Sequence, residues 1–358
     1  MTLLDRYIIK KFLSTFFFAL LLFFIISIVI DLVERIDDFI NCDASLGVII
    51  TQYYLPFIPW IGAILFPLFV FISVLFFTSK MASQSEFIAM LGNGVSYYRI
   101  LVPYIITAAL LSVLLFVGNH YIVPWSNAKK LAFENTYFSH GYKASAQNIH
   151  MRLSKNEFIF LENYNHHENE GYKFTYEKFT NGLMTYKIKC DRIEWNYKSK
   201  NWNLYNCAIR TFDGKIESMT KEAKLNQNYA IVPSDFEKKE EIKEAMSTPQ
   251  LNEFIKVEES RGADNLEKFY VEKLRRTAAC FSLLIMTLIG VAVAARKSRG
   301  GTGVPIAVGL ILSSAYILFM QMSTTFANQA GLNPYLGTWI PNVLFTIIAI
   351  ILIRRAQK

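Results

Sequence analysis

The sequence predicts a multi-pass α-helical membrane protein with six transmembrane helices and an inserted antiparallel β-domain. Of the 358 residues, 53% are hydrophobic and 15% are aromatic, and the apolar residues are gathered into long blocks. This distribution indicates a membrane protein, because a soluble domain would spread these residues at amphipathic spacing. Between the third and fourth blocks lies a polar stretch, Val123 to Glu272, with alternating aromatic and β-branched residues that predict strands.

The six apolar runs are each close to the roughly 20 residues that a helix needs to cross a bilayer. They are Phe12 to Ile30, Leu55 to Phe77, Ile100 to Val117, Thr277 to Ala295, Val304 to Thr325 and Trp339 to Ile353. The first run is too long for a cleaved signal peptide, and no small-residue cleavage pattern follows it. We therefore expect six spanning helices.

Positive charge at the ends of the runs predicts their orientation. With six crossings, the clusters that fall on one side are Arg6, Lys10 and Lys11; Lys80 and Arg99; Arg296, Lys297 and Arg299; and Arg354, Arg355 and Lys358. The opposite short loops are nearly free of Lys and Arg, since residues 31–54 contain only Arg35 and residues 326–338 contain none. By the positive-inside rule, both termini are expected in the cytoplasm. These clusters explain the net charge of +8, so nucleic acid binding is not expected.

The polar stretch is expected outside the cytoplasm, as a periplasmic β-domain. Asn181-Gly182 is a hairpin turn signal between two predicted strands, and Thr248-Pro249 marks the start of a later helix. An antiparallel sandwich or a jelly-roll-like fold is the expected class, because isolated hairpins are not stable. We therefore expect an N-terminal membrane half over residues 1–122, the β-domain over residues 123–262, and a C-terminal membrane half over residues 263–358.

Two of the four cysteines fall on one predicted hairpin. If its turn is Lys198-Ser199, then Trp195 pairs with Trp202, and Cys190 faces Cys207 in the same register. An oxidising compartment would permit a cross-strand disulfide. Two buried free thiols are the commoner arrangement, and the sequence leaves both readings open.

The polar interval Thr78 to Arg99, between the second and third runs, can form a short helix of its own near residues 83–93. Ser85 is the expected N-cap before Glu86, and Gly92 and Gly94 are expected to end the helix. The apolar residues at helical spacing are Phe87, Ile88, Met90 and Leu91. Such a helix across the cytoplasmic ends of two spans could be pushed by a partner, and an ordinary interfacial loop is the alternative.

The residues show no enzyme site, so we expect neither catalysis nor a metal or cofactor bound by this chain. Gly214-Lys215 is followed by Ile216, which breaks the Walker A pattern, and motifs of metalloproteases, hydrolases and kinases are missing. The pair His166-His167 lies in a polar loop, where adjacent histidines are typically solvated turn residues. No acidic residue falls inside the six runs, so proton-coupled transport is not indicated.

Basic residues on the outer side run against the topological bias. They are Arg35 near the outer end of the first run and Lys273, Arg275 and Arg276 at the outer end of the fourth. Anionic headgroups of an amphipathic lipid would explain them, and snorkelling to ordinary lipid phosphates would explain them equally well.

Five stretches together resemble lipopolysaccharide export permeases of the LptF/LptG type, also called the YjgP/YjgQ family, over essentially the whole chain. In order, they are LDRYIIKKFL, SQSEFIAMLGNGVS, KLRRTAACFSLLIMTLIGV, RKSRGGTGVPIAVG and NPYLGTWIPNVLF. Six spans split by an outer β-domain is also an uncommon architecture. The SQSEF wording and the compact β-domain are closer to the LptG member than to LptF.

The resemblance implies a half-transporter in the inner membrane of a Gram-negative bacterium. Such a subunit pairs with a sister permease and binds a dimeric ABC ATPase, which holds ATP and Mg²⁺. It extracts lipopolysaccharide from the membrane and passes it to a periplasmic bridge protein.

The resemblance also implies roles for particular residues. The short cytoplasmic helix would be the coupling helix, with Glu86 contacting the ATPase together with Phe87, Ile88, Met90 and Leu91. The first and fifth spans would line the substrate cavity. The residues that would meet the lipid there are Arg35, Leu32, Lys273, Arg275 and Arg276, although Glu34 beside Arg35 departs from a simple basic rim.

A function of a different class also fits the topology. The chain could be a membrane scaffold whose outer β-domain binds a partner and whose cytoplasmic helix passes on a signal. That reading does not account for apolar walls with a basic outer rim. A membrane enzyme acting on lipid is not supported, because no credible set of acid, base or metal ligands is present.

Overall fold

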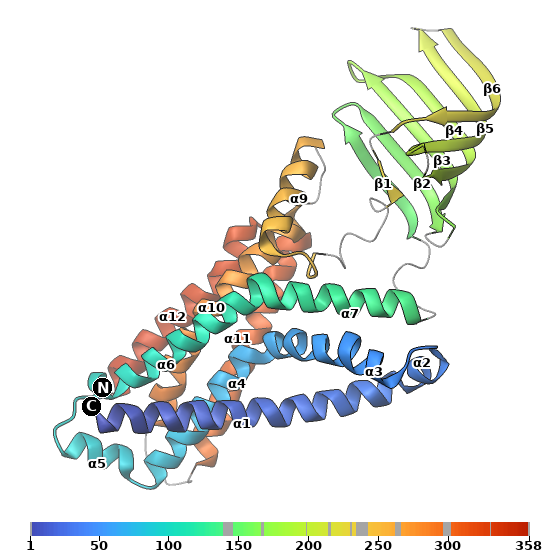
Figure 1. Ribbon diagram of the computed structural model, residues 1–358. Helices are drawn as coiled ribbons and strands as arrows, with labels where there is room; N and C mark the ends of the chain where they lie inside the picture. The colour runs from blue at the N-terminus through green and yellow to red at the C-terminus, as the bar shows by residue number, and fades with distance from the viewer. Residues whose placement is uncertain are drawn as a thin grey trace. The chain divides into compact units, whose positions relative to one another are not determined.

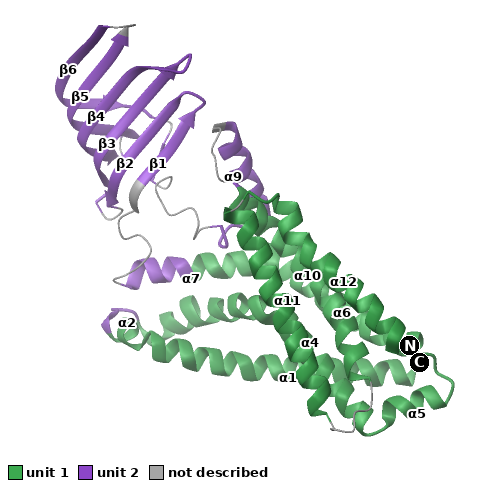
Figure 2. Cartoon of the chain, turned by 180° about the vertical axis from the view of Figure 1, so that it is seen from behind, with its two compact units in different colours: residues 1–40, 45–130, 267–358 green, residues 41–44, 131–266 purple. Residues whose placement is uncertain are grey.

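The computed structural model describes residues 2–138, 146–165, 168–197, 199–213, 216–229, 231–233, 243–261, 266–295, 302–329 and 331–356. Residues named above that lie outside these ranges are His166, His167, Lys198, Gly214, Lys215, Arg296, Lys297, Arg299 and Lys358. The chain forms two compact units, coloured separately in Figure 2. The membrane unit comprises Met1–Ile40, Ser45–Lys130 and Glu267–Lys358, and the β-unit comprises Asn41–Ala44 and Leu131–Leu266.

The membrane unit confirms the six predicted spans, since six helices among the described residues are long and apolar enough to cross a membrane. Four of them are single helices: α1 (Leu3–Glu34), α10 (Glu267–Ala294), α11 (Gly303–Gln329) and α12 (Pro334–Ala356). The other two are continuous with short segments: α3 (Leu46–Val48) and η1 (Ile49–Tyr54) precede α4 (Leu55–Ser83), while η2 (Gly118–Ile122) and α7 (Val123–Tyr137) follow α6 (Tyr97–Val117). The remaining short helices are α2 (Ile36–Asn41) and α5 (Glu86–Gly92).

Helix α1 is longer at both ends than the apolar run that predicted it. It begins with a capping box, in which the Thr2 side chain accepts from the Asp5 backbone N–H while the Thr2 N–H donates to Asp5 Oδ2. At its other end, α1 continues past Ile30 to Glu34, which places the buried Asp31 inside the helix. The apolar run Phe12 to Ile30 itself contains no acid, as predicted, and Asp31 follows it directly in the same helix.

Helix α10 is the central helix of the membrane unit and packs against α4, α6, α11 and α12. In its most apolar window, 67% of the residues are buried, compared with 22% in α11 and only 6% in α1. The start of α1 and the end of α12 lie at the same end of this unit as α5 (Figure 1). An even number of crossings brings both ends of the chain to one side in this way.

Among its described residues, the β-unit contains one six-stranded antiparallel sheet whose strands are in chain order. The strands are β1 (Ala146–Ser154), β2 (Glu157–Asn165), β3 (Glu170–Thr180), β4 (Leu183–Asn196), β5 (Asn201–Asp213) and β6 (Ile216–Gln227). This confirms the antiparallel β-domain, but as a single open sheet and not as the two packed sheets of a sandwich or a jelly roll. The reason is that each strand pairs antiparallel with the next one along the chain, so the described strands form a single sheet.

Local turn chemistry sets the register of this sheet. Asn181 and Gly182 both have positive φ, at 53° and 79°, and connect β3 to β4 as predicted. Across β4 and β5, Trp195 pairs with Trp202 and Cys190 with Cys207, so the predicted register is confirmed. The strands share an apolar core that includes Leu161, Phe174, Ile188 and Leu204. The predicted later helix is α9 (Thr248–Arg261), which begins at Thr248 as expected.

Candidate functional site

The short helix α5 forms where the sequence predicted it, between α4 and α6. Ser85 is its N-cap residue, as predicted, but it lies in the left-handed region at φ 61° and makes no side-chain capping bond. The Ser85 carbonyl instead accepts the first helical bond, from the Ala89 N–H. At the other end, Gly94 has φ 81° and its N–H donates to the Leu91 carbonyl, which ends the helix as expected.

The predicted apolar arc of α5 divides into a buried side and an exposed side. Phe87 is 1% exposed and packs against Tyr97 of α6, with the ring centroids 6.1 Å apart, and Met90 is half-buried against the same core. Ile88 and Leu91 are 47% and 39% exposed. Only these last two present an open apolar surface of the kind that a partner could cover, while Phe87 anchors the helix to its own chain.

Glu86, the first residue of α5, is held by α1. Tyr7 Oη donates to Glu86 Oε2 at 2.7 Å, and Lys11 Nζ lies 3.3 Å from Oε2 and 3.5 Å from Oε1. Lys11 Nζ also lies 4.3 Å from the centroid of the Tyr7 ring. Neither partner was predicted from the sequence, although Tyr7 and Lys11 are four residues apart and so share one face of a helix.

A second ion pair joins α1 to the start of α6, just beyond α5. Arg99 Nη1 and Nη2 donate to Asp5 Oδ1 and Oδ2 at 2.7 and 2.8 Å. Two parallel bonds of this kind fix the guanidinium more firmly than a single contact does. The Ser96 side chain accepts from the Arg99 N–H and so caps α6. The predicted cytoplasmic Arg99 is therefore a link between helices as well as a marker of orientation.

Arg35, the candidate outer basic residue of α1, is paired with an acid on its own helix. Arg35 Nε lies 3.5 Å from Asp31 Oδ1, and the same oxygen accepts from Tyr53 Oη of η1 at 3.0 Å. The side chain of Asp31 is buried, whereas that of Arg35 is partly exposed. Its neighbour Leu32 is exposed. Arg35 can reach an outside ligand, but Asp31 already offsets part of its charge.

The other basic candidates, on α10, form an ion triad with Glu272. The buried Glu272 accepts from Arg275 Nη2 and Nε at 2.8 and 3.1 Å through Oε2, and from Arg276 Nε at 3.0 Å through Oε1. The side chain of Arg276 is 5% exposed and that of Arg275 is 45% exposed, while Lys273 is half-buried. The predicted cluster is therefore one internal pair plus two groups, Arg275 and Lys273, that reach the surface. The spacing of Glu272 to the two arginines, three and four residues, is the signal that could have found the triad.

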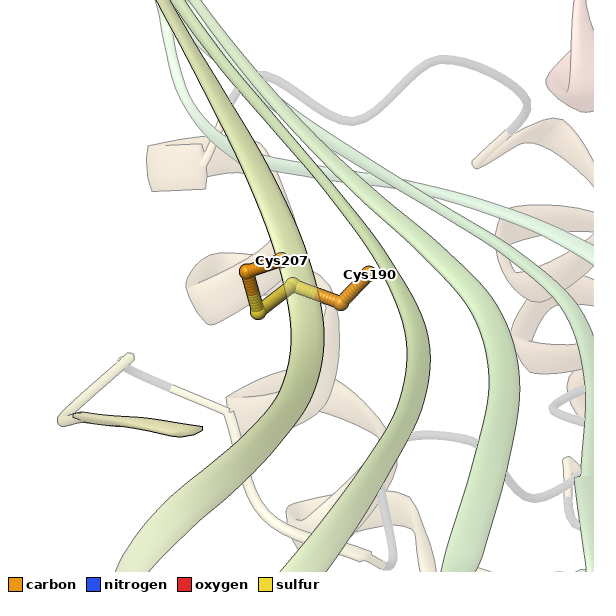
Figure 3. The surroundings of a disulfide bond; sticks show 2 residues. All are labelled: Cys190 and Cys207. Carbon is orange, nitrogen blue, oxygen red and sulfur yellow. A yellow bond between two sulfur atoms is a disulfide. The ribbon is translucent and has the colours of Figure 1, made fainter. Parts of the chain in front are cut away.

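The two cysteines of the predicted hairpin are joined as a disulfide. Figure 3 shows the bond between Cys190 of β4 and Cys207 of β5, and both residues are buried in the core of the sheet. Of the two readings that the sequence left open, the structure contains the disulfide. Cys42 and Cys280 take no part in this disulfide.

The geometry of these groups supports ion pairing and apolar contact. Within the described ranges, no cluster of three or more His, Cys, Asp or Glu side chains could hold a metal ion. The functional candidates are therefore the open face of α5, the link from Glu86 to α1, and the outer arginines of α1 and α10.

Comparison with known proteins gives one result of nearly full length. Residues 6–355 match the family described as lipopolysaccharide export system permease LptF/LptG. No curated protein matches the chain. The family match covers all six long helices and the β-unit.

Proposed function

This chain belongs to the LptF/LptG family, the permease subunits of the lipopolysaccharide export ABC transporter, and on that premise we propose how its parts perform export. Permeases of this family are multi-pass transmembrane subunits without an ATPase domain. We infer that a dimeric ABC ATPase binds the ATP and Mg²⁺, and that a sister permease completes the membrane path. The same reasoning assigns the chain to the inner membrane with both termini in the cytoplasm, in accord with its clusters of Lys and Arg.

The bare surface of α1 is the observation that best supports a lipid path. Between the buried Phe16 and the buried Asp31, none of the side chains of α1 is buried, and Phe18, Ile25 and Val29 are more than half exposed. The next least buried long helix is α11. Apolar helix faces that the chain leaves uncovered face lipid, a partner helix or an apolar substrate. In this proposal, α1 and α11 line the cavity shared with the sister permease, and its apolar walls receive the acyl chains of lipopolysaccharide.

The basic residues at the outer ends of α1 and α10 would meet the phosphates of the same substrate. In this proposal Arg35, Lys273 and Arg275 contact the lipid because their side chains reach the surface. Leu32, next to Asp31, is exposed and would contact the acyl chains. Arg276 contributes indirectly, because it is buried and fixes Glu272, which in turn orients Arg275.

At the cytoplasmic end, α5 is proposed as the coupling helix. Ile88 and Leu91 would fill a groove on the ATPase, since they are the large exposed apolar residues of the helix. Phe87 and Met90 would hold α5 against the permease while it is pushed. Glu86, the first residue of the helix, is proposed to couple to the ATPase together with these four apolar residues.

The β-unit is proposed to receive the lipid outside the membrane and to pass it to a periplasmic bridge protein. In this proposal, residues 1–122 and 263–358 are the two membrane halves, and residues 123–262 are the β-domain inserted between them. A membrane scaffold remains the competing function, and it predicts no contact between lipopolysaccharide and α1.

Site-specific photo-crosslinking in cells tests this proposal. A photoreactive residue at Leu32 or at Val29 should capture lipopolysaccharide, because both side chains are exposed on α1. The matched control is Ile289 of α10, which is fully buried and should capture none. If neither α1 position captures lipopolysaccharide, in a protein that crosslinks to its sister subunit elsewhere, the scaffold function is favoured.

A further inference from the structure

The cytoplasmic end of α1 is bound to α5 by a hydrogen-bonded ion pair. Glu86 Oε2 accepts from Tyr7 Oη at 2.7 Å and lies 3.3 Å from Lys11 Nζ. The Lys11 ammonium is also stacked over the Tyr7 ring, at 4.3 Å from its centroid. Three side chains thus satisfy one another, and each fixes the position of the other two. A carboxylate held in this way already has partners within its own subunit.

The apolar side chains beneath this contact belong to the same body. Ile8 and Phe12 of α1 are fully buried in one core with Phe87 of α5. Phe12 packs against Phe77 of α4 and Tyr104 of α6, with centroid distances of 5.5 and 6.3 Å. Close-packed groups of this kind move together, because displacing one opens a cavity beside the others.

The bidentate Arg99 to Asp5 pair adds a second attachment on the far side of α5. Arg99 follows α5 by seven residues after Gly92 and holds the first turn of α1. Both ends of the segment that carries α5 are therefore tied to α1: Glu86 at the start and Arg99 beyond the end.

Beyond Phe16, α1 changes character. Its next buried side chain is Asp31, fifteen residues further, which is bonded to Tyr53. At 1.5 Å per residue, this is about 22 Å of helix without a fully buried side chain. Because α1 is one continuous helix, a displacement of its fixed end would reach its other end, where Asp31 is bonded to Tyr53.

We propose that Tyr7 and Lys11 are positioning residues that bind Glu86 so that α5 and the first turns of α1 move as one body, delivering the stroke received at α5 directly to α1. This inference rests on the proposed function and adds the route by which a displacement of α5 reaches α1. Glu86 acts as the inner link of the coupling helix, while Ile88 and Leu91 form the outer contact.

The test compares transport per ATP hydrolysed in the purified complex, reconstituted with lipopolysaccharide. Tyr7→Phe and Lys11→Gln each remove one partner of Glu86 and leave the exposed face of α5 intact. We expect normal co-purification of the ATPase and normal hydrolysis, with lipid release per ATP lowered about two- to fivefold, as for a partly exposed hydrogen bond or ion pair. The matched controls are Tyr98→Phe and Lys10→Gln, because both side chains are exposed and close by, and these should behave as wild type.

Charge reversal separates this role from a direct contact with the ATPase. Lys11→Glu should lower release per ATP, whereas Lys11→Arg should retain it, because an arginine keeps the ion pair with Glu86. Equal losses of release per ATP in Lys11→Arg and Lys11→Glu, or loss of ATPase binding in Tyr7→Phe and Lys11→Gln, would overturn the proposal. Unchanged release per ATP in all the single variants would overturn it as well.

A distance measurement tests the inference without relying on lipid release. Spin labels at Lys10→Cys and Ala89→Cys, both exposed, report the separation of α1 and α5 in a background lacking Cys42 and Cys280. We expect one narrow distance in the nucleotide-free and the vanadate-trapped complex, broadened by Lys11→Gln. A distance that differs between the two nucleotide states would overturn the proposal. If the wild-type complex releases no lipid, the proposed function fails, and this distance still decides whether α1 and α5 move together.

Discussion

Removing the carboxylate of Glu272 should destabilise the membrane unit far more than removing any exposed acid. Glu272 bonds Arg276 through Nε at 3.0 Å, and the two side chains are only 7% and 5% exposed. Removing one partner of a buried ion pair costs about 3–5 kcal/mol. The bonds to Arg275 add little, because that guanidinium is 45% exposed and water can replace its partner.

The measurement is the free energy of unfolding of the full-length protein in mixed detergent micelles. Glu272→Ala should lower it by about 3–5 kcal/mol. Glu267→Ala, an exposed acid in the first turn of the same helix, is the matched control and should change it by less than about 1 kcal/mol. The double variant Glu272→Leu with Arg276→Leu should recover most of the loss, because a buried ion pair can be replaced by apolar side chains of similar size.

Two results would refute this reasoning. A loss below about 1 kcal/mol in Glu272→Ala would mean that Arg276 finds solvent or another acceptor at little cost. A double variant no more stable than Glu272→Ala would mean that the loss comes from packing at position 272 and not from the charge left on Arg276.

Three further predictions concern the β-unit and α5. The double variant Cys190→Ser with Cys207→Ser removes a disulfide between residues 17 positions apart. It should lower the protection of β4 and β5 amides against hydrogen exchange by about 3 kcal/mol. Alkylation of both thiols in the wild type without prior reduction would contradict the disulfide. Phe87→Ala should cost about 3–5 kcal/mol and expose α5 to proteases, while Ile88→Ala should leave stability within about 1 kcal/mol of wild type and weaken ATPase binding; equal effects on stability would refute the division of the arc. Burial raises the pKa of the Tyr229 phenol, which packs against the sheet core, so this group ionises at lower pH in the unfolded chain than in the folded one. The β-unit should therefore lose stability as the pH rises above about 10, and Tyr229→Phe should reduce this loss. The same loss of stability with pH in Tyr229→Phe would contradict the prediction.

Properties set by local sequence were predictable. The six spans follow from the length of the apolar runs, and the pairing of Trp195 with Trp202 follows from the turn and from the two-residue period of a strand. The Asn181-Gly182 turn is predictable because both residues tolerate positive φ.

Properties set by long-range packing were not predictable. Tyr7 and Lys11 meet Glu86 across 79 and 75 residues of chain, and no local pattern records that distance. Phe87 and Ile88 look alike in sequence, and only the packing of α5 against Tyr97 decides which of them is buried. The single open sheet was missed for a related reason: strand patterns predict that a strand forms, but closure into two sheets depends on which strands its ends reach.

ATP-driven release of lipopolysaccharide from proteoliposomes tests the central claim most directly. The chain, purified from its native membrane with whatever ATPase and sister permease accompany it, is reconstituted with lipopolysaccharide, and transfer to a soluble periplasmic acceptor is followed. We predict transfer that requires ATP and that falls when Ile88 and Leu91 are replaced by alanine. ATP hydrolysis by the same complex without any transfer of lipid would contradict the account.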